Sequence, residues 1–343
     1  MAFTKIATLV EPEKIIMSEI AVPEPKDDEV LIKISYVGIC GSDIHAYFGQ
    51  HPFISCPIVM GHEFSGTVVK IGSGVKGIAV GDKVTAMPQV FCKECEPCRE
   101  GRYNICDTLK VLGCQTPGAA CEYYAVGAEL VKVVNGKLPL DLAATVEPAA
   151  VGLHAVRRAG SVAGKNVVVL GAGTIGNLAA QSAMAEGAKS VLISDLSDYR
   201  LGVAKECGIP FAVNSGKEDL GEAIRGYFRG EGADLFVECV GIGATVNQAI
   251  SLSKKGNDIV VVGVFGKTPE INMSFVQDRE LRLMGSLMYV EKDWDDVTEY
   301  LGTGRMNTRP LITRVFPFDE YFDAFKYIKA NSEKSMKILT KVD

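Results

Sequence analysis

The chain has 343 residues, 47% of them hydrophobic and 23% charged, which excludes a disordered polypeptide and predicts about two globular domains. Its 36 basic residues against 42 acidic ones give a formal net charge of −6, which disfavours a nucleic-acid-binding protein. We expect no signal peptide, lipidation motif or membrane span, because glycine or charge breaks every apolar stretch well before about 18 residues. The sequence therefore predicts a soluble, cytoplasmic protein.

The first part of the chain is predicted to form a β domain. Segments 29–38, 63–72 and 81–87 are rich in β-branched residues and are separated by turns that contain glycine and aspartate. Short strands at this spacing are typical of a sandwich or a barrel.

Cys40, His62 and Glu63 are candidate metal ligands in this domain. A thiolate, an imidazole and a carboxylate can form a catalytic zinc site whose remaining position holds water or substrate. Each residue could also have no role in metal binding. A single cysteine usually packs in the core, and some of the four histidines are expected to be ordinary core or surface residues. Spacing alone leaves both interpretations open.

A second candidate metal site is the run Cys92, Cys95, Cys98 and Cys106, with the spacing C-x2-C-x2-C-x7-C. Four thiolates on one short loop can surround a zinc ion tetrahedrally and leave no position open, so we predict a structural zinc site. An iron–sulfur cluster is the alternative, but the long last interval and the absence of a following Cys-Pro pair disfavour it. Four unligated cysteines at this density are a weaker alternative.

From about residue 154 to about residue 285 the sequence alternates between strand-like and helix-like segments. Strand-like stretches at 166–170, 190–194, 234–241 and 258–266 are separated by helical runs, which predicts a parallel sheet covered on both faces. The expected fold class is therefore a β domain followed by a doubly wound α/β domain.

Directly after the first of these strands the chain reads Gly-Ala-Gly-Thr-Ile-Gly, from Gly171 to Gly176. Gly171 permits a tight turn, Gly173 lets a pyrophosphate approach the backbone, and Gly176 lets the helix pack close to the strand. Asp195 ends the next strand, where a carboxylate accepts hydrogen bonds from ribose hydroxyls and favours NAD over NADP, although the nearby Arg200 weakens that preference. A glycine turn that binds nothing is the alternative. The expected cofactor-binding residues are Gly171, Gly173, Thr174, Ile175, Gly176, Asp195, Arg200 and Gly263.

Taken together, the motifs resemble those of the zinc-dependent medium-chain dehydrogenases. The motifs that carry the resemblance are CGSDIH at 40–45, GHEFSGTVVKIG at 61–72, the four-cysteine loop and GAGTIG at 171–176. They occur in the family's order and cover essentially the whole chain. The segment VEPAAVGLHA at 146–155 is similar to the sorbitol (L-iditol) dehydrogenase branch, since alcohol dehydrogenases commonly carry cysteine at the position of Glu147.

The resemblance implies a GroES-like β-barrel catalytic domain, a Rossmann NAD-binding domain and two zinc ions per chain, one catalytic and one structural. The implied boundaries are 1–153, completed by 286–343, for the catalytic domain and 154–285 for the cofactor domain. The family's usual assembly implies a homotetramer or a dimer, with the edge strand near 280–286 as an association surface.

Carried over residue by residue, the resemblance gives each candidate side chain a role. Cys40 and His62 would bind the catalytic zinc, and Glu63 and Glu147 would share the remaining protein coordination, with the direct ligand left open. The other implied roles are Asp43 orienting His62, Ser42 and His45 passing a proton to solvent, and Tyr289 contacting the substrate.

The implied activity is the reversible, NAD-dependent oxidation of a secondary alcohol of a polyol to a ketone. The branch often has an arginine before the tyrosine, and Met288 stands there instead, so a sugar alcohol, an inositol-type polyol and a butanediol-like diol all remain candidates. A simple alcohol or threonine dehydrogenase is the alternative within the superfamily. A catalytically inert NAD-binding sensor is the alternative from another class.

Overall fold

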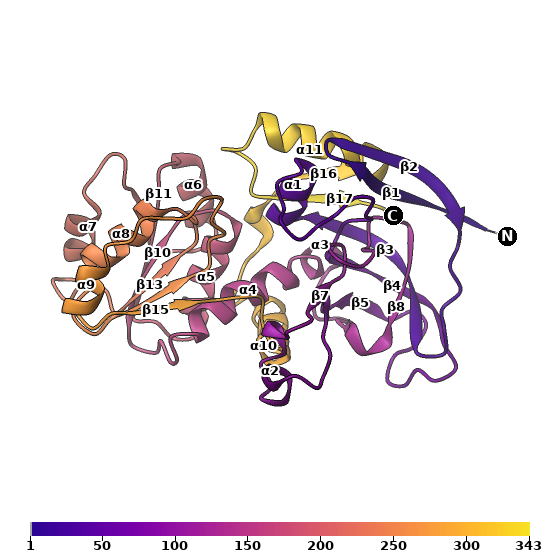
Figure 1. Cartoon of the computed structure of the whole chain (residues 1–343), viewed down its shortest axis with the longest axis horizontal. Coiled ribbons are helices and arrows are strands. Elements are labelled where there is room, and N and C mark those ends of the chain that lie inside the picture. The colour runs from indigo at the N-terminus through magenta and orange to yellow at the C-terminus, as the bar shows by residue number, and fades with distance from the viewer. Residues whose placement is uncertain (1) are drawn as a thin grey trace. The chain divides into compact units, whose positions relative to one another are not determined.

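The computed structural model describes residues 2–343 and divides into two compact units (Figure 1). Unit 1 contains the residues up to Glu147 together with Ile312–Asp343, and unit 2 contains Pro148–Leu311. Both predicted fold classes are confirmed, a β-rich unit and a parallel α/β unit. Within residues 2–343, no helix has both the length and the apolar character needed to cross a bilayer.

Unit 1 is built on a mixed seven-stranded sheet in the order β16-β17-β3-β4-β5-β9, with β8 also paired to β3. Alternate residues of β3, Val30, Ile32 and Ile34, are fully buried in one core, as the two-residue period of a strand requires. The strands of unit 1 are β1 Phe3–Glu11, β2 Lys14–Ala21, β3 Glu29–Ile39, β4 Glu63–Ile71, β5 Lys83–Ala86, β6 Gln89–Val90, β7 Lys110–Val111, β8 Tyr123–Gly127, β9 Val131–Val133, β16 Ile312–Pro317 and β17 Lys337–Lys341. Its helices are α1 Gly41–Tyr47, α2 Glu96–Arg99, η1 Tyr103–Ile105, η2 Ala128–Leu130, α3 Leu140–Ala143, η4 Phe318–Glu320 and α11 Tyr321–Ala330.

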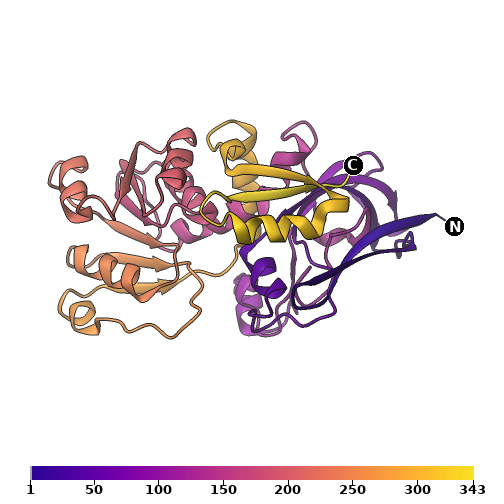
Figure 2. The same cartoon turned by 90° about the horizontal axis from the view of Figure 1, so that it is seen from above.

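The end of the chain is part of unit 1, as Figure 2 shows by the grouping of β16, β17 and α11. Strand β17 pairs antiparallel with β3, so that Ile338 lies opposite Ile39. Tyr321 and Phe325 of α11 are buried in the same core as Leu9 of the β1–β2 ribbon. These contacts place the last residues beside the end of β3, where the candidate metal ligands lie.

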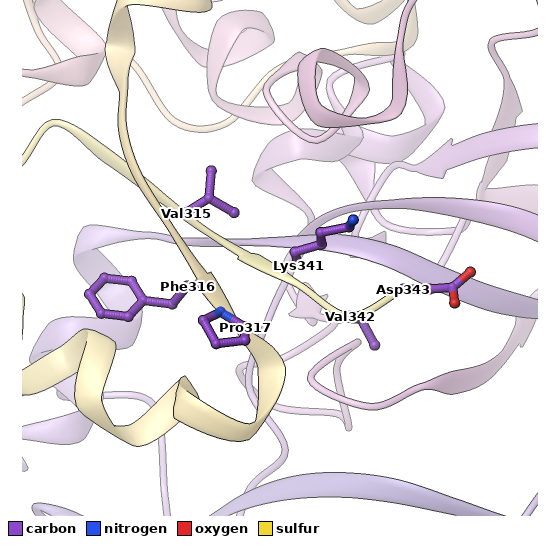
Figure 3. Close-up of a pocket in the computed structure, with 6 residues that line it drawn as sticks. All are labelled: Val315, Phe316, Pro317, Lys341, Val342 and Asp343. Atoms are coloured by element: carbon purple, nitrogen blue, oxygen red, sulfur yellow. The ribbon is translucent and has the colours of Figure 1, made fainter.

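A shallow pocket of about 420 Å³ opens beside β16 and β17 (Figure 3). It is lined by Val315, Phe316, Pro317, Lys341, Val342 and Asp343. None of the side chains expected to bind metal, cofactor or substrate lines this pocket.

Unit 2 is a six-stranded parallel sheet in the order β12-β11-β10-β13-β14-β15, the order of a doubly wound dinucleotide-binding fold. Along β10, Val167 and Val169 enter one core while Val168 and Leu170 enter the other, so helices cover both faces. Its strands are β10 Asn166–Leu170, β11 Ser190–Asp195, β12 Phe211–Asn214, β13 Leu235–Glu238, β14 Asp258–Val261 and β15 Arg282–Gly285. Its helices are α5 Thr174–Ala185, α6 Asp198–Glu206, α7 Leu220–Tyr227, α8 Gly243–Leu252, α9 Met273–Asp278, α10 Glu291–Gly302 and η3 Arg309–Leu311, and α4 Val146–Arg157 begins at the boundary.

Residues 148–153 and 286–311 group with unit 2 in the structure, and the expected domain boundaries of 1–153 with 286–343 and of 154–285 stay a prediction. A partly buried charge network joins α10 to α4 within unit 2. Arg157 donates hydrogen bonds to Asp293 at 3.0 Å and Asp296 at 2.6 Å, and His154 Nδ1 lies 2.7 Å from Asp293. Composition alone did not indicate that α10 is fixed to α4 in this way.

Candidate metal centres and cofactor pocket

The first candidate centre lies where β3 ends and β4 begins. Cys40 directly follows β3 and caps α1, while Glu63 is the first residue of β4. The two strands pair so that Gly38 lies opposite Glu63, and a side chain at Gly38 would put its Cβ 2.4 Å from the Glu63 carboxylate. The ligand atoms of Cys40, His62 and Glu63 all lie within 4.8 Å of one another. The pairing therefore brings together three ligands that the sequence separates.

Helix α1 supplies the side chains expected to support this centre. Asp43 is fully buried, its Oδ2 accepts a hydrogen bond from the Cys40 backbone N–H at 2.8 Å, and its Oδ1 lies 3.8 Å from His62 Nδ1. Ser42 is half-buried and His45 is exposed. The helix thus runs from a buried carboxylate beside the imidazole to a histidine in contact with solvent.

Lys337 of β17 is a buried partner of this centre that the sequence pattern did not reveal. Its Nζ donates hydrogen bonds to both Glu63 carboxylate oxygens, at 2.7 and 2.5 Å, and to the Ile39 carbonyl at 3.1 Å. The Lys337 side chain is 5% exposed and that of Glu63 is 1% exposed. Only the pairing of β17 with β3, across about 300 residues of sequence, brings this ammonium group to the candidate ligands.

The electrostatic field of this centre favours positive charge. Burial alone would lower the pKa of His62, but Asp43 and Cys40 outweigh it and raise that pKa. Burial also opposes the charge of Lys337, yet Glu63 and Cys40 raise its pKa. A thiol, an imidazole and a carboxylate in a field that holds cations are the donor set that a zinc ion takes. The residues therefore fit a zinc site.

Two further side chains border the centre without completing it. Glu147, in the first turn of α4, is 5% exposed and raises the pKa of Lys337, but it lies outside the group formed by Cys40, His62 and Glu63. The buried thiol of Cys114, which sequence reasoning did not single out, contacts the His62 imidazole. The chain around Cys114 is fixed by backbone hydrogen bonds, such as that from the Gly118 N–H to the Val59 carbonyl.

The second candidate centre is the four-cysteine loop around α2. The Cys92 Sγ lies 3.5 Å from that of Cys106 and 3.9 Å from that of Cys98. These values match the separation of about 3.8 Å between thiolates at the corners of a tetrahedron with zinc–sulfur bonds of about 2.3 Å. Backbone N–H groups of Glu94 and Cys95 donate to the Cys92 sulfur, which favours its thiolate form and lowers its pKa. All four sulfur atoms lie within 4.8 Å of one another.

In unit 2 the glycine loop has the geometry that its sequence predicts. Gly171 adopts φ +97°, which favours glycine, and a Cβ on Gly176 would lie 1.8 Å from the Gly171 carbonyl oxygen. A Cβ on Gly173 would meet nothing within 4 Å, so the backbone there is open to a ligand. Helix α5 begins at Thr174 and continues with Ile175.

Asp195 joins the glycine loop to the end of the neighbouring strand. Its Oδ2 accepts a hydrogen bond from the Ala172 N–H at 2.7 Å and lies 3.9 Å from Arg200 Nη1. A pocket of about 340 Å³ opens at this end of the sheet. Its lining includes Gly171, Gly173, Asp195, Arg200, Val240, Ile242 and Thr245. This is the position where a doubly wound sheet binds a dinucleotide.

Two further residues of the expected site, Gly263 and Tyr289, have close packing contacts in this structure. A Cβ on Gly263 would lie 2.1 Å from the Gly241 nitrogen, so the contact between two loops requires glycine there, and its expected role in cofactor binding stays a prediction. Tyr289 is fully buried, and its ring lies 5.5 Å from that of Trp294. Tyr289 therefore has a core contact with α10, and its expected contact with the substrate stays a prediction.

Comparison with known proteins agrees with this arrangement. Residues 26–135 match the alcohol dehydrogenase GroES-like domain, and residues 174–302 match the zinc-binding dehydrogenase family. The chain is 36% identical to a sorbitol dehydrogenase of Halalkalibacterium halodurans, covering 94% of both chains, and 34% identical to a D-arabitol-phosphate dehydrogenase of Enterococcus avium, covering 93% of this chain and 92% of that one. A zinc-binding dehydrogenase of Sinorhizobium meliloti bound to NADP superposes with a TM-score of 0.92 at 32% identity and full coverage of both chains.

The match to both family domains, together with relatives above 30% identity over almost the whole length, shows the relationship. The chain is a zinc-binding dehydrogenase with an alcohol dehydrogenase GroES-like domain, and it resembles the sorbitol dehydrogenases.

Proposed function

We propose that the protein oxidises a secondary alcohol of a polyol to a ketone with NAD, using zinc bound by Cys40 and His62. The observation that carries the proposal is the grouping of a thiol, an imidazole and a carboxylate within 4.8 Å in unit 1 of a chain whose unit 2 has an intact dinucleotide loop. The names of the two relatives, a sorbitol and an arabitol-phosphate dehydrogenase, support a polyol substrate.

The third protein ligand is proposed to be Glu63, with Glu147 acting from the edge of the site. Glu63 belongs to the compact group and Glu147 does not. Lys337 holds both Glu63 oxygens, so binding of the metal by Glu63 requires this ion pair to loosen. The four-cysteine loop has no position for a substrate and is proposed to hold a structural zinc ion.

A zinc ion held by these residues would supply Lewis-acid activation of the alcohol oxygen, and a bound nicotinamide would supply the hydride acceptor. The chain's own part is to move the hydroxyl proton. The half-buried Ser42 hydroxyl would accept that proton while it gives its own proton to the next acceptor, and the exposed His45 imidazole on the same helix would pass a proton on to solvent. Asp43 holds the Cys40 backbone and orients His62 so that neither ligand has to reorganise during turnover.

For the cofactor we propose NAD rather than NADP. The Asp195 carboxylate faces the pocket, accepts hydrogen bonds from ribose hydroxyls and repels a 2′-phosphate. Arg200 is close enough to Asp195 to be partly neutralised by it, which reduces its ability to attract a phosphate. The related Sinorhizobium structure holds NADP, so both cofactors need to be compared.

Cell location and assembly are further parts of the proposal. A cytoplasmic enzyme that forms a dimer or tetramer through the edge strand β15 fits the family resemblance and the exposed edge of the unit 2 sheet.

The decisive experiment follows NADH absorbance with zinc-quantified protein and a panel of linear polyols, inositols, diols, simple alcohols and threonine. Turnover on polyols or inositols with NAD, and two zinc ions per chain, is the expected result. Turnover only on simple alcohols or threonine would contradict the polyol assignment, and turnover only with NADP would contradict the role of Asp195. A protein that binds zinc and NADH but oxidises nothing in the panel would favour the inert sensor.

A further inference from the structure

Glu238 is a fully buried carboxylate at the last position of β13. It lies at the carboxyl end of the parallel sheet, the end at which the cofactor pocket opens. Neither the metal chemistry nor the proton path described above uses it. A buried carboxylate is costly unless hydrogen bonds satisfy it, so its partners indicate what it does.

One carboxylate oxygen of Glu238 organises the turn that follows it. Oε1 accepts hydrogen bonds from the backbone N–H groups of Val240 and Gly241, both at 2.9 Å, and from the Thr245 hydroxyl at 2.7 Å. The turn from residue 239 to residue 245 is therefore fixed at both its beginning and its end. Thr245 lies in the first turn of α8, so the same oxygen also sets where that helix begins.

The other oxygen, Oε2, is buried, has no hydrogen-bond partner among residues 2–343, and points toward the loop after β14. A Cβ on Gly263 would lie 2.8 Å from this oxygen, and a Cβ on Gly241 would lie 2.4 Å from the Val264 carbonyl oxygen. The two loops thus contact each other through glycines, with no side chain between them. The main-chain carbonyl of Glu238 also accepts a hydrogen bond from the Gly263 N–H at 3.1 Å.

The turn held by Glu238 forms one wall of the cofactor pocket. Val240, Ile242 and Thr245 line it, while Asp195 lines it from the end of β11. In the sheet, β10 lies between β11 and β13. The glycine loop after β10 therefore has Asp195 on one side and the turn after β13 on the other. Asp195 is at the ribose position of the fold, and the wall formed by the turn therefore serves the adenosine half of the cofactor.

We propose that Glu238 is a positioning residue. It fixes the conformation of the turn that forms this wall before the cofactor binds, and so determines the affinity for the adenosine half of the cofactor. The proposal rests on the proposed use of NAD. A turn that is already ordered loses little conformational entropy when the cofactor binds, whereas a loosened turn has to be ordered by the ligand. The loss is expected in binding and not in the proton transfer, whose residues are in unit 1.

The test is calorimetric titration of the purified protein with ADP-ribose, which contains the adenosine half and cannot undergo hydride transfer. Glu238→Ala is expected to raise the Kd for ADP-ribose at least about tenfold, because three hydrogen bonds to the turn are lost. Glu238→Gln keeps a carbonyl oxygen that can accept all three and should stay within about threefold of the wild type. Thr245→Val removes one of the three bonds and should fall between them.

Asp258→Asn is the matched control. Asp258 is also a buried acid, at the first position of β14, where it pairs with Arg282. It lies at the other end of a neighbouring strand, so the substitution should lower Tm and leave the Kd for ADP-ribose unchanged. Equal weakening by Asp258→Asn and Glu238→Ala would show a general loss of stability and overturn the positioning role.

The remaining outcomes are also decisive. An unchanged Kd in Glu238→Ala or in Thr245→Val would overturn the proposal, and Thr245→Val keeps the test valid if Glu238→Ala does not fold. A wild-type protein that binds zinc but neither ADP-ribose nor NADH would instead refute the proposed cofactor, a failure that is visible before any variant is made.

Discussion

The metal centre of unit 1 and the cofactor pocket of unit 2 are assembled in different ways. Cys40 directly follows β3, His62 directly precedes β4 and Lys337 begins β17. They meet because β17 and β4 both pair with β3, although Lys337 lies about 300 residues after β3 in the sequence. The glycine loop is one uninterrupted strand, turn and helix between Asn166 and Ala185. The first site depends on tertiary pairing and buried charge, and the second depends mainly on local backbone conformation.

The largest effect is expected when the metal centre loses its thiolate. Cys40→Ala should reduce turnover about 10³-fold or more, because the Lewis acid contributes several kcal/mol to the reaction. The change should leave ADP-ribose binding by unit 2 intact. Turnover is measured as kcat, and ADP-ribose binding is measured separately by calorimetry. Cys56→Ala is the control, since Cys56 is another partly buried free cysteine of unit 1 that belongs to neither cysteine cluster. Loss of ADP-ribose binding in Cys40→Ala would show that the two sites are not independent.

The next effect concerns the buried ion pair behind the metal centre. Lys337→Met should destabilise the zinc-free protein by about 3 kcal/mol, because it leaves the Glu63 carboxylate buried without its cation. Zinc should restore more of the lost Tm in this variant than it adds to the wild type, since the metal replaces the missing positive charge. Thermal unfolding with and without zinc measures both quantities.

Lys341→Met is the matched control for this prediction, because Lys341 is on the same strand but exposed. Its change in unfolding free energy should stay within about 0.5 kcal/mol. If Lys337→Met behaved like Lys341→Met, the buried pair would contribute nothing to stability and the contrast between the two sites would weaken.

The smallest effect is expected in the charge network of unit 2. Burial opposes ionisation of Asp293, but the hydrogen bonds from His154, the Val290 N–H and Arg157 lower its pKa. A lowered folded-state pKa means that this stability is present above the ordinary aspartate pKa and is lost as the pH falls through the folded value. Asp293→Asn should therefore cost about 1 to 2 kcal/mol near neutral pH and make the decline of stability below about pH 4 shallower.

Urea unfolding between neutral and acidic pH measures this difference, and Asp295→Asn is the control because Asp295 is an exposed acid on the same helix. A variant whose stability falls as steeply with acid as that of the wild type would show that Asp293 does not carry the acid sensitivity of unit 2.

The sites that these predictions test also differ in how much of each site could be predicted from the sequence. The four cysteines and the glycine loop were predictable because their geometry follows from spacing within one short segment, and Asp195 followed from the end of the next strand. The pairing of Lys337 with Glu63 was not predictable, because no local pattern indicates which strand lies beside β3. For the same reason no local pattern indicated that α10 groups with unit 2 or that Tyr289 is buried against Trp294.

The sequence by itself determined the fold class, the two candidate metal clusters and the dinucleotide loop, since each depends on residue type and short-range spacing. Only the tertiary structure decided that Glu63 rather than Glu147 groups with Cys40 and His62. It also decided that Lys337 donates hydrogen bonds to the Glu63 carboxylate, and that Glu238 accepts hydrogen bonds from the turn that lines the cofactor pocket. The physical reason is that buried charges are stabilised by partners that strand pairing brings together. Which strands pair cannot be predicted from any single segment of the sequence.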